Sequence, residues 1–373
     1  IKWRKLFMDK YLKRIYQLVF IIAIIFLVAA CGQDENKENG NSDNSEGPDD
    51  VTTLTFNHWL SSNHYIADAF DEWANIVEEK TEGRVKIDIY SDGALGDQLQ
   101  VHEDVAGGVY DIGEVTVSAM EDTPVFVHSI GNLPFAFDSI DTSFSVMKSF
   151  LEEYGKDIYE ENNLVFMSHS TSAKYALHSR TPIRKVDDAK GKIINASANS
   201  MTKVFENWGA TREALAFSEL YQAVQRGTID ALWLPAPAAY DTSFYEVAPY
   251  VTKFNGPSYN FQAAFVMSPD GYASIPDDLK PLFEEELFPL LGEMHRDSYP
   301  DDEEIWSTIN GLFETLEGEV IELTPEEEVE FQKGAEPVWE EWVNEANDRG
   351  YPGDEMMDYF KKLLKDEGIE IPF

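Results

Sequence analysis

From Val51 onward, two spacings of apolar residues alternate along the chain. In residues 64–80 apolar side chains recur every three or four positions, which predicts an amphipathic helix, and a second helix is expected over residues 97–106. Short runs of alternating or continuous apolar residues flank these helices and predict strands at 54–57, 85–90 and 109–116. Strands and helices that alternate across short turns indicate an α/β protein with a mostly parallel sheet covered by helices.

Two further apolar runs, residues 164–172 and 261–267, are expected to be strands that cross between two halves of the molecule. The helical region that follows them contains Pro289 and Pro300, which should break or kink it because proline has no amide hydrogen. Acidic helices with an apolar side are then predicted at 324–347 and 354–367.

The chain has 373 residues, enough for two lobes with a sizeable core. We expect residues 51–171 with about 266–312 to form one lobe, and residues 172–265 with about 313–373 to form the other. Two crossings between the lobes would form a hinge, and small changes of backbone dihedral angle there would close the lobes on a ligand.

The stretch from Phe217 to Pro235 predicts a short helix followed by a buried strand, with Gly227 suited to end the helix. Its residues resemble the signature of DctP-like substrate-binding proteins of TRAP transporters, which are tripartite, ATP-independent uptake systems driven by ions. The matching positions are Glu219, Tyr221, Gln225, Gly227, Asp230 and Pro235. Ala231 stands where that family usually has glycine.

The resemblance extends from about Leu54 to Met267. Family-like motifs follow in the family's order at Thr81–Val85, Leu95–Gly96, Gly108–Ile112, Leu133–Phe137 and Asp188–Asn195. The resemblance implies a periplasmic-binding-protein-like fold of the type II kind, with a hinge and a long helix that spans both lobes. It also implies that a small molecule binds between the lobes and is delivered to integral-membrane permease subunits.

The first thirty residues carry a targeting pattern. Residues 1–14 hold six basic residues against one acid, and residues 18–30 are wholly apolar, which is typical of a secretory signal. This apolar run is shorter than the roughly 20 residues of a membrane-spanning helix, although an uncleaved signal anchor is the alternative. Leu27–Cys31 resembles the lipobox of bacterial lipoproteins, which implies a signal peptide over residues 1–30 and a diacylated Cys31.

Residues 32–50 contain no large apolar side chain and should stay disordered. Together with Cys31 they are expected to tether the folded module to the outer face of the cell membrane. Because Cys31 is the only cysteine, no internal disulfide is possible within this sequence.

Charge and motif content exclude several classes of function. A formal net charge of −40 leaves no basic surface to neutralise phosphates, so nucleic acid is not expected as a partner. The seven histidines lack metal-ligand spacing, and no nucleotide-binding, serine-hydrolase or zinc-protease motif occurs in the sequence. We therefore expect no metal, no cofactor and no catalysis.

Ligands of open α/β lobes bind at strand ends, in pockets that combine aromatic walls with a few polar groups. The candidate ligand-binding residues selected on this basis are Trp59, Asp92, Glu114, Thr171, Tyr175, Asn195, Phe217, Trp233 and Asn260. Each has a structural alternative: the large aromatic residues can equally belong to the core, and the polar ones can lie on the surface or cap a turn.

The family resemblance also bears on the charge of the solute. Asn195 stands where TRAP binding proteins usually have an arginine that holds the substrate carboxylate, and Tyr175 stands where some members have a second arginine. Lys174 would have to supply the positive charge instead. Since the other candidates are aromatic or acidic, we expect neutral or cationic solutes to bind better than dicarboxylates.

These observations predict an extracytoplasmic solute-binding lipoprotein that serves a TRAP-type permease. The alternatives are an ABC-type solute-binding lipoprotein, a ligand-sensing module and, less favoured, an extracellular lipoprotein enzyme. Neighbouring genes would separate the two transporter types, and turnover of metabolites would reveal an enzyme.

Overall fold

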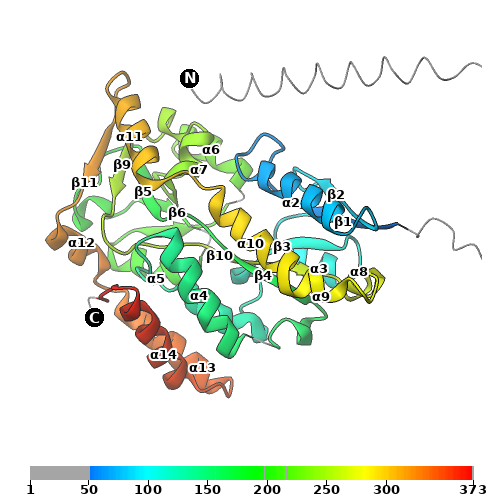
Figure 1. The fold of residues 1–373 in the computed structure, drawn as a ribbon. Helices are drawn as coiled ribbons and strands as arrows, with labels where there is room; N and C mark the ends of the chain where they lie inside the picture. Colours follow the sequence, from blue (N-terminus) through cyan, green and yellow to red (C-terminus); the bar gives the residue numbers. More distant parts are fainter. Residues whose placement is uncertain (1–50, 156, 197, 216, 372–373) are drawn as a thin grey trace, which may run out of the picture. The chain divides into compact units, whose positions relative to one another are not determined.

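The fold of this protein is built on two β-sheets with helices packed around them (Figure 1). The computed structural model describes residues 51–371 except 156, 197 and 216. The predicted signal peptide, the lipidated Cys31 and the tether lie outside the described residues. No helix among the described residues has both the length and the apolar character that crossing a membrane requires.

The first sheet has the strand order β2-β1-β3-β10-β4. Its strands are β1 (Thr52–Asn57), β2 (Val85–Tyr90), β3 (Ile112–Thr116), β4 (Val165–Thr171) and β10 (Gln262–Met267). Strand β1 pairs in parallel with β2 and β3, whereas β10 lies between β3 and β4 and is antiparallel to both. All five strands were expected from the sequence.

The second sheet has the order β11-β9-β5-β8-β6-β7. Its strands are β5 (Tyr175–Ser179), β6 (Ile193–Asn195), β7 (Thr211–Glu213), β8 (Ala231–Pro235), β9 (Tyr250–Lys253) and β11 (Glu319–Glu322). Strand β6 is parallel to β7 and β8, but β5 is antiparallel to β8 and β9. The expectation of a mostly parallel sheet is therefore wrong in part, because β5 and β10 each enter a sheet directly from the other one and run against their neighbours.

Helices surround both sheets. The α-helices are α2 (Ala67–Lys80), α3 (Val101–Ala106), α4 (Ile140–Tyr154), α5 (Ser200–Asn207), α6 (Phe217–Arg226), α7 (Ala236–Asp241), α8 (Pro269–Ser274), α9 (Lys280–Leu282), α10 (Phe288–Asp297), α11 (Asp302–Phe313), α12 (Pro325–Gln332), α13 (Glu336–Asp348) and α14 (Gly353–Asp366). The helices predicted at 64–80 and from Phe217 to Arg226 are confirmed as α2 and α6.

The helical region between the lobes is interrupted, as its prolines predicted. Phe283–Leu287 forms a π-helical turn, Pro289 lies in the first turn of α10, and Pro300 lies in the break before α11. The Asp301 carboxylate caps α11 by accepting hydrogen bonds from two backbone amides of its first turn. Helix α10 packs on α2 and β4 of the first sheet, whereas α11 packs on α7 and β11, so the broken helix passes from one sheet to the other.

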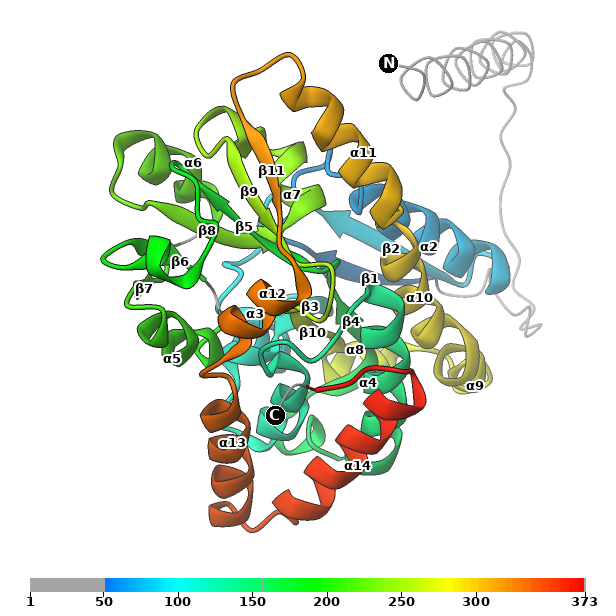
Figure 2. The same ribbon diagram turned by 90° about the vertical axis from the view of Figure 1, so that its left-hand side faces the viewer.

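The C-terminal helices pack beside segments that precede β4 in the chain (Figure 2). Helix α14 lies against α4, and α13 contacts the 3-10 helix η2 (Pro124–Asn132). The indole of Trp339 donates to the Pro134 carbonyl at 3.0 Å, and that of Trp342 donates to Ser129 Oγ at 3.0 Å. The domain limits given above stay a prediction.

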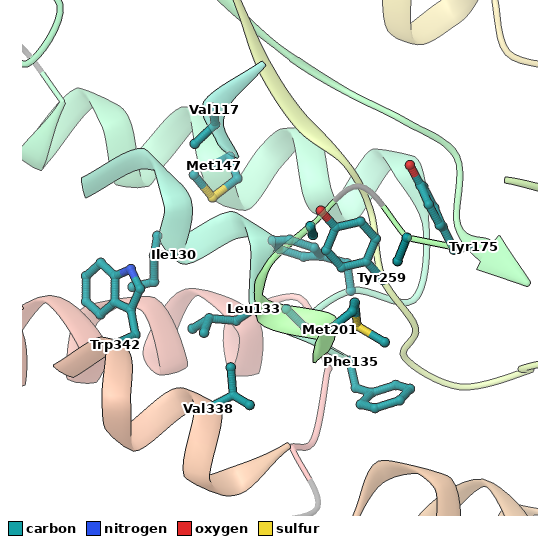
Figure 3. Packing of buried hydrophobic residues seen from close by; sticks show 14 of the residues in the cluster. Val117, Ile130, Leu133, Phe135, Met147, Tyr175, Met201, Tyr259, Val338 and Trp342 are labelled. Atoms are coloured by element: carbon teal, nitrogen blue, oxygen red, sulfur yellow. The ribbon is translucent and has the colours of Figure 1, made fainter. Parts of the chain in front are cut away.

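One hydrophobic cluster extends through residues of both sheets (Figure 3). Ile130, Met147 and Trp342 belong to it, and so do Tyr175 and Tyr259 from the crossings between the sheets. Because buried apolar area is the main source of folding free energy, this shared cluster stabilises the hinge region as well as the lobes.

Candidate ligand-binding site

A buried carboxyl group, Glu114 of β3 in the first sheet, lies beside helix α10, which leads toward the second sheet. It is only 5% exposed, and it accepts hydrogen bonds from Ser170 Oγ at 2.7 Å and from the indole of Trp59. Ser170 belongs to β4, which lies on the far side of β10 from Glu114. Burial raises the pKa of Glu114, while its two hydrogen bonds oppose that rise. The neutral acid is thus more favoured here than in water.

His295 of α10 lies next to this carboxyl group. Its Nε2 is 3.8 Å from Glu114 Oε1, and its Nδ1 is 3.3 Å from Ser170 Oγ. Burial lowers the pKa of His295 to about 3, so the imidazole is uncharged at neutral pH and does not form an ion pair with Glu114.

Two tyrosines extend this polar group toward the second sheet. Tyr65 and Tyr299 are hydrogen-bonded to each other, with ring centroids 5.6 Å apart, and both are only half-buried. Electrostatic interactions link Tyr299 to both Glu114 and Tyr175. Burial raises the pKa of both phenols, so their hydroxyl groups stay protonated and can donate hydrogen bonds. The sequence analysis missed both tyrosines, because only tertiary contacts bring them to Glu114.

Trp59 and Phe217 join the two lobes across the site. Trp59 follows β1 and Phe217 begins α6, and their rings meet edge to face with centroids 6.0 Å apart. Both side chains are half-buried. The structure therefore brings Trp59, Glu114 and Phe217 together, with Trp59 in contact with each of the other two.

Tyr175 and Trp233 lie deeper in the second lobe. Tyr175 packs edge to face on Tyr259, with centroids 4.9 Å apart (Figure 3). Trp233 is 1% exposed and packs among aromatic rings that include Phe205 and Phe254. Its position is inside the hydrophobic core, behind Tyr175.

Thr171 and Asn260 lie in the crossings between the sheets. Thr171 Oγ1 lies 2.7 Å from Ser143 Oγ and accepts a hydrogen bond from Gln262 Nε2 at 3.1 Å. Asn260 Nδ2 donates to the Ser172 carbonyl at 2.7 Å. These bonds connect the strand that leaves the first sheet with the strand that returns to it.

Asn195, Asp92 and Lys174 have different surroundings, and the backbone amide of Asp92 donates to the Leu60 carbonyl, next to Trp59, at 2.9 Å. Asn195 Nδ2 donates to the Glu213 carbonyl of β7 at 3.1 Å. Asp92 is exposed in a turn, where it has a left-handed φ of 59°. Lys174 Nζ donates to the carbonyl oxygens of Asn255 and Gly256 at 3.2 and 3.3 Å. The predicted set of ligand-binding residues stays a prediction.

A metal site would need a cluster of ligating side chains among the described residues. Among them, no group of three or more His, Cys, Asp or Glu side chains is placed to hold a metal ion.

Two α/β lobes, crossings between them, and half-buried aromatic and polar side chains at their junction define a two-lobed solute-binding protein. Residues 56–346 match the family model DctP, described as bacterial extracellular solute-binding protein, family 7. The match covers more than half of the chain, and the chain belongs to this family. The resemblance to TRAP substrate-binding proteins is thereby confirmed.

The individual relatives and solved structures described next share less than 30% sequence identity with this chain. A solute-binding protein of Chromohalobacter salexigens is 29% identical over 184 residues, which are 49% of this chain and 54% of the relative. The chain thus matches about half the length of that relative. A TRAP periplasmic solute-binding protein of Sulfurospirillum deleyianum, with bound succinate, has 23% identity and a TM-score of 0.72 over 84% of this chain and 99% of its own. One from Rhodoferax ferrireducens, with copurified benzoate, has 18% identity and a TM-score of 0.74 over 85% and 99%.

The prediction that neutral or cationic solutes are favoured over dicarboxylates is wrong. Similar structures hold succinate, β-D-galacturonate and D-glucuronate, all of which are anions. The prediction treated Glu114 and Asp92 as charges that repel an anion. Burial instead favours the neutral form of Glu114, and Asp92 is exposed, where water and salt screen its charge.

Proposed function

We propose that this protein captures a small organic solute bearing a carboxylate between its lobes and delivers it to a TRAP-type permease. The observation that carries the proposal is the position of Trp59, which bonds to Glu114 of the first sheet and packs on Phe217 of the second lobe. The anionic ligands of the related binding proteins support the carboxylate.

The chemistry of the junction suits an oxygen-rich solute. The rings of Trp59 and Phe217 offer apolar faces, and Tyr65 and Tyr299 supply hydroxyl donors. Burial raises the pKa of Glu114, so the site disfavours its negative charge, and the group remains able to form hydrogen bonds. These groups can bind hydroxyl and carbonyl oxygens, but a carboxylate also needs a nearby cation.

Binding and release would require the lobes to move apart and together. Trp59 and Phe217 come from different lobes, so opening the molecule separates their rings and exposes the site. The crossings around Thr171 and Asn260 contain short segments without regular structure, in which a few dihedral angles can change.

The test of solute capture is a thermal-shift and calorimetry screen with succinate, D-glucuronate and benzoate. A ligand at about 100 times its dissociation constant stabilises the folded state by about 2.7 kcal/mol, which a melting curve resolves. Trp59→Ala should weaken binding of the acid that shifts the wild type, while Val329→Ala, on the exposed side of α12, should not. Equal affinities of the two variants would contradict this location of the site.

We also propose that Cys31 is diacylated and anchors the protein at the outer face of the membrane. The support is the lipobox-like Leu27–Cys31 and membership in an extracellular family. Cys31→Ser should release the protein from the membrane fraction or leave it unprocessed, and it should abolish labelling with a fatty-acid analogue. Retained labelling in that variant would rule out this anchor.

Finally, we propose that the protein binds its solute without transforming it. The support is that its family and its structural neighbours are solute-binding proteins. Prolonged incubation with the bound acid should return it unchanged in mass spectrometry, and any product that depends on the protein would contradict the proposal.

A further inference from the structure

A bound carboxylate needs a nearby cation. The family resemblance places an arginine for this purpose at the end of β6, but this chain has Asn195 there. Asn195 ends β6, and its amide is bonded to the Glu213 carbonyl of the neighbouring strand β7. Lys174 is directed instead to the carbonyl groups of Asn255 and Gly256. The following argument rests on the proposed function, in which the solute is a carboxylate.

A guanidinium group reaches the same place from β7. Ile194 of β6 is paired with Arg212 of β7, and Asn195 is paired with Glu213. From that position the Nε of Arg212 donates to the carbonyl of Ala196, the residue just after Asn195, at 2.8 Å. The Arg212 side chain therefore crosses from β7 to the C-terminal end of β6, where ligands of α/β sheets bind.

The surroundings of Arg212 come from both lobes. Arg212 is half-buried, and its charge interacts with Glu121, which follows β3 of the first sheet, and with Tyr259 of the returning crossing. Burial lowers the pKa of Arg212, but a guanidinium stays protonated in proteins. The group is thus a permanent positive charge at the junction of the lobes.

Glu121 is the acid that an anionic solute would have to compete with. It is half-buried, and its Oε2 accepts a hydrogen bond from Asn199 Nδ2 at 3.1 Å. Burial raises the pKa of Glu121, which weakens its hold on a cation relative to an exposed carboxylate. A solute carboxylate can therefore take over part of the interaction with Arg212.

We propose that Arg212 binds the carboxylate of the solute. Strand β7 would then supply the guanidinium group at the end of β6, where Asn195 replaces the arginine of the family. The planar guanidinium matches a carboxylate in shape, with two parallel hydrogen bonds, and its bond to Ala196 orients it beforehand. Arg212 is then the residue that makes the site select acids over neutral solutes.

The experiment measures the affinity of Arg212→Gln and Arg212→Lys for whichever of succinate, D-glucuronate and benzoate binds the wild type. Arg212→Gln should weaken that acid about 10- to 100-fold, as expected for the loss of charge-assisted hydrogen bonds, and Arg212→Lys should lose less. Glu121→Gln should bind the acid several-fold more tightly. Arg226→Gln, which removes an exposed arginine at the end of α6, is the matched control and should bind like the wild type.

Binding of the neutral amide of the same acid distinguishes a contact between Arg212 and the carboxylate from a purely structural role of Arg212. If Arg212 contacts the carboxylate, the amide binds the wild type and Arg212→Gln within about twofold of each other, whereas a distorted site weakens acid and amide alike. Arg212→Gln that binds the acid as tightly as the wild type would overturn the proposal. So would equal losses for acid and amide.

The remaining outcomes are also decisive. Should Arg212→Gln fail to fold by circular dichroism, Arg212→Lys and Glu121→Gln carry the test, and unchanged affinity in both would contradict the proposal. If none of the three acids binds the wild type, the carboxylate part of the proposed function fails, and the role of Arg212 fails with it. A wild type that binds an acid but does not depend on Arg212 refutes the role of Arg212 alone.

Discussion

Trp59 follows β1 and Trp233 is the central residue of β8, and these two tryptophans of different lobes have opposite surroundings. Trp59 is half-buried, its indole bonds to Glu114, and its ring meets Phe217. Trp233 is 1% exposed inside an aromatic cluster, and its Nε1 has no hydrogen-bond partner among the described residues. The polar junction around Trp59 is suited to binding, whereas the cluster around Trp233 is suited to holding the second lobe together.

The difference comes from what covers each ring. Phe254 packs on Trp233, and Phe331 packs on Phe254. Later parts of the chain therefore cover this side of the second sheet. Over Trp59 the covering group is Phe217 of the other lobe, which can move away when the lobes open. The two tryptophans thus differ in whether the group that covers the ring belongs to the same lobe.

The largest expected effect is on folding stability. Trp233→Ala should lower the free energy of unfolding by about 3–5 kcal/mol, because it leaves a large cavity in a closed aromatic cluster. Trp59→Ala should cost about 1 kcal/mol, since its side chain is only half-buried. Urea unfolding followed by circular dichroism measures both, and similar losses in the two variants would break the comparison.

Acid should destabilise the polar junction through His295. Its pKa is about 3 in the folded protein and near 6.5 in the unfolded chain, so its contribution to stability is complete above pH 6.5 and is lost as the pH falls toward 3. The slope from this one group approaches about 1.4 kcal/mol per pH unit. His295→Gln should reduce the slope of the unfolding free energy against pH between pH 6.5 and 4 by the share of this one group, since burial also lowers the pKa of His58, His169 and His178. His102→Gln, on α3, is the control, and equal slopes in both variants would argue against buried His295.

The third prediction concerns the affinity for the acid that binds the wild type. Trp59→Ala should weaken it about tenfold, by loss of the aromatic face and of the bond to Glu114. Trp59→Phe should recover part of the loss, because it restores an aromatic face but no indole N–H. Calorimetry gives both values at one temperature, and a Trp59→Phe variant weaker than Trp59→Ala would be inconsistent with a role for the ring.

The smallest effect is expected for Glu114→Gln, which keeps the shape of the side chain. Burial raises the folded-state pKa of Glu114, so its contribution to stability is full below the unfolded pKa and declines as the pH rises toward the folded one. Glu114→Gln should therefore gain stability relative to the wild type with rising pH. Unfolding in urea at pH 4 and pH 8 gives this difference. A relative loss at pH 8 would show that Glu114 is stabilised as a carboxylate.

Local spacing by itself determined several helices and strands, and the family of this protein. The period of apolar residues placed α2, and Gly227 placed the end of α6, because helix and strand formation depend mainly on neighbours in the chain. The two prolines predicted the interrupted crossing helix for the same reason. The signature from Phe217 to Pro235 indicated the solute-binding family.

Only the tertiary structure decided which side chains are in contact and which charged groups are buried. Strand β7 is three residues long and was not expected, so the approach of Arg212 to the end of β6 was invisible in the sequence. The expected repulsion of anions was wrong, since similar structures hold anions. It counted Glu114 as an ordinary surface acid, whereas burial by residues distant in the chain raises the pKa of that group. Trp59 and Trp233 were equal candidates in the sequence, and only the segments folded over them left one half-buried at the junction and the other inside the core.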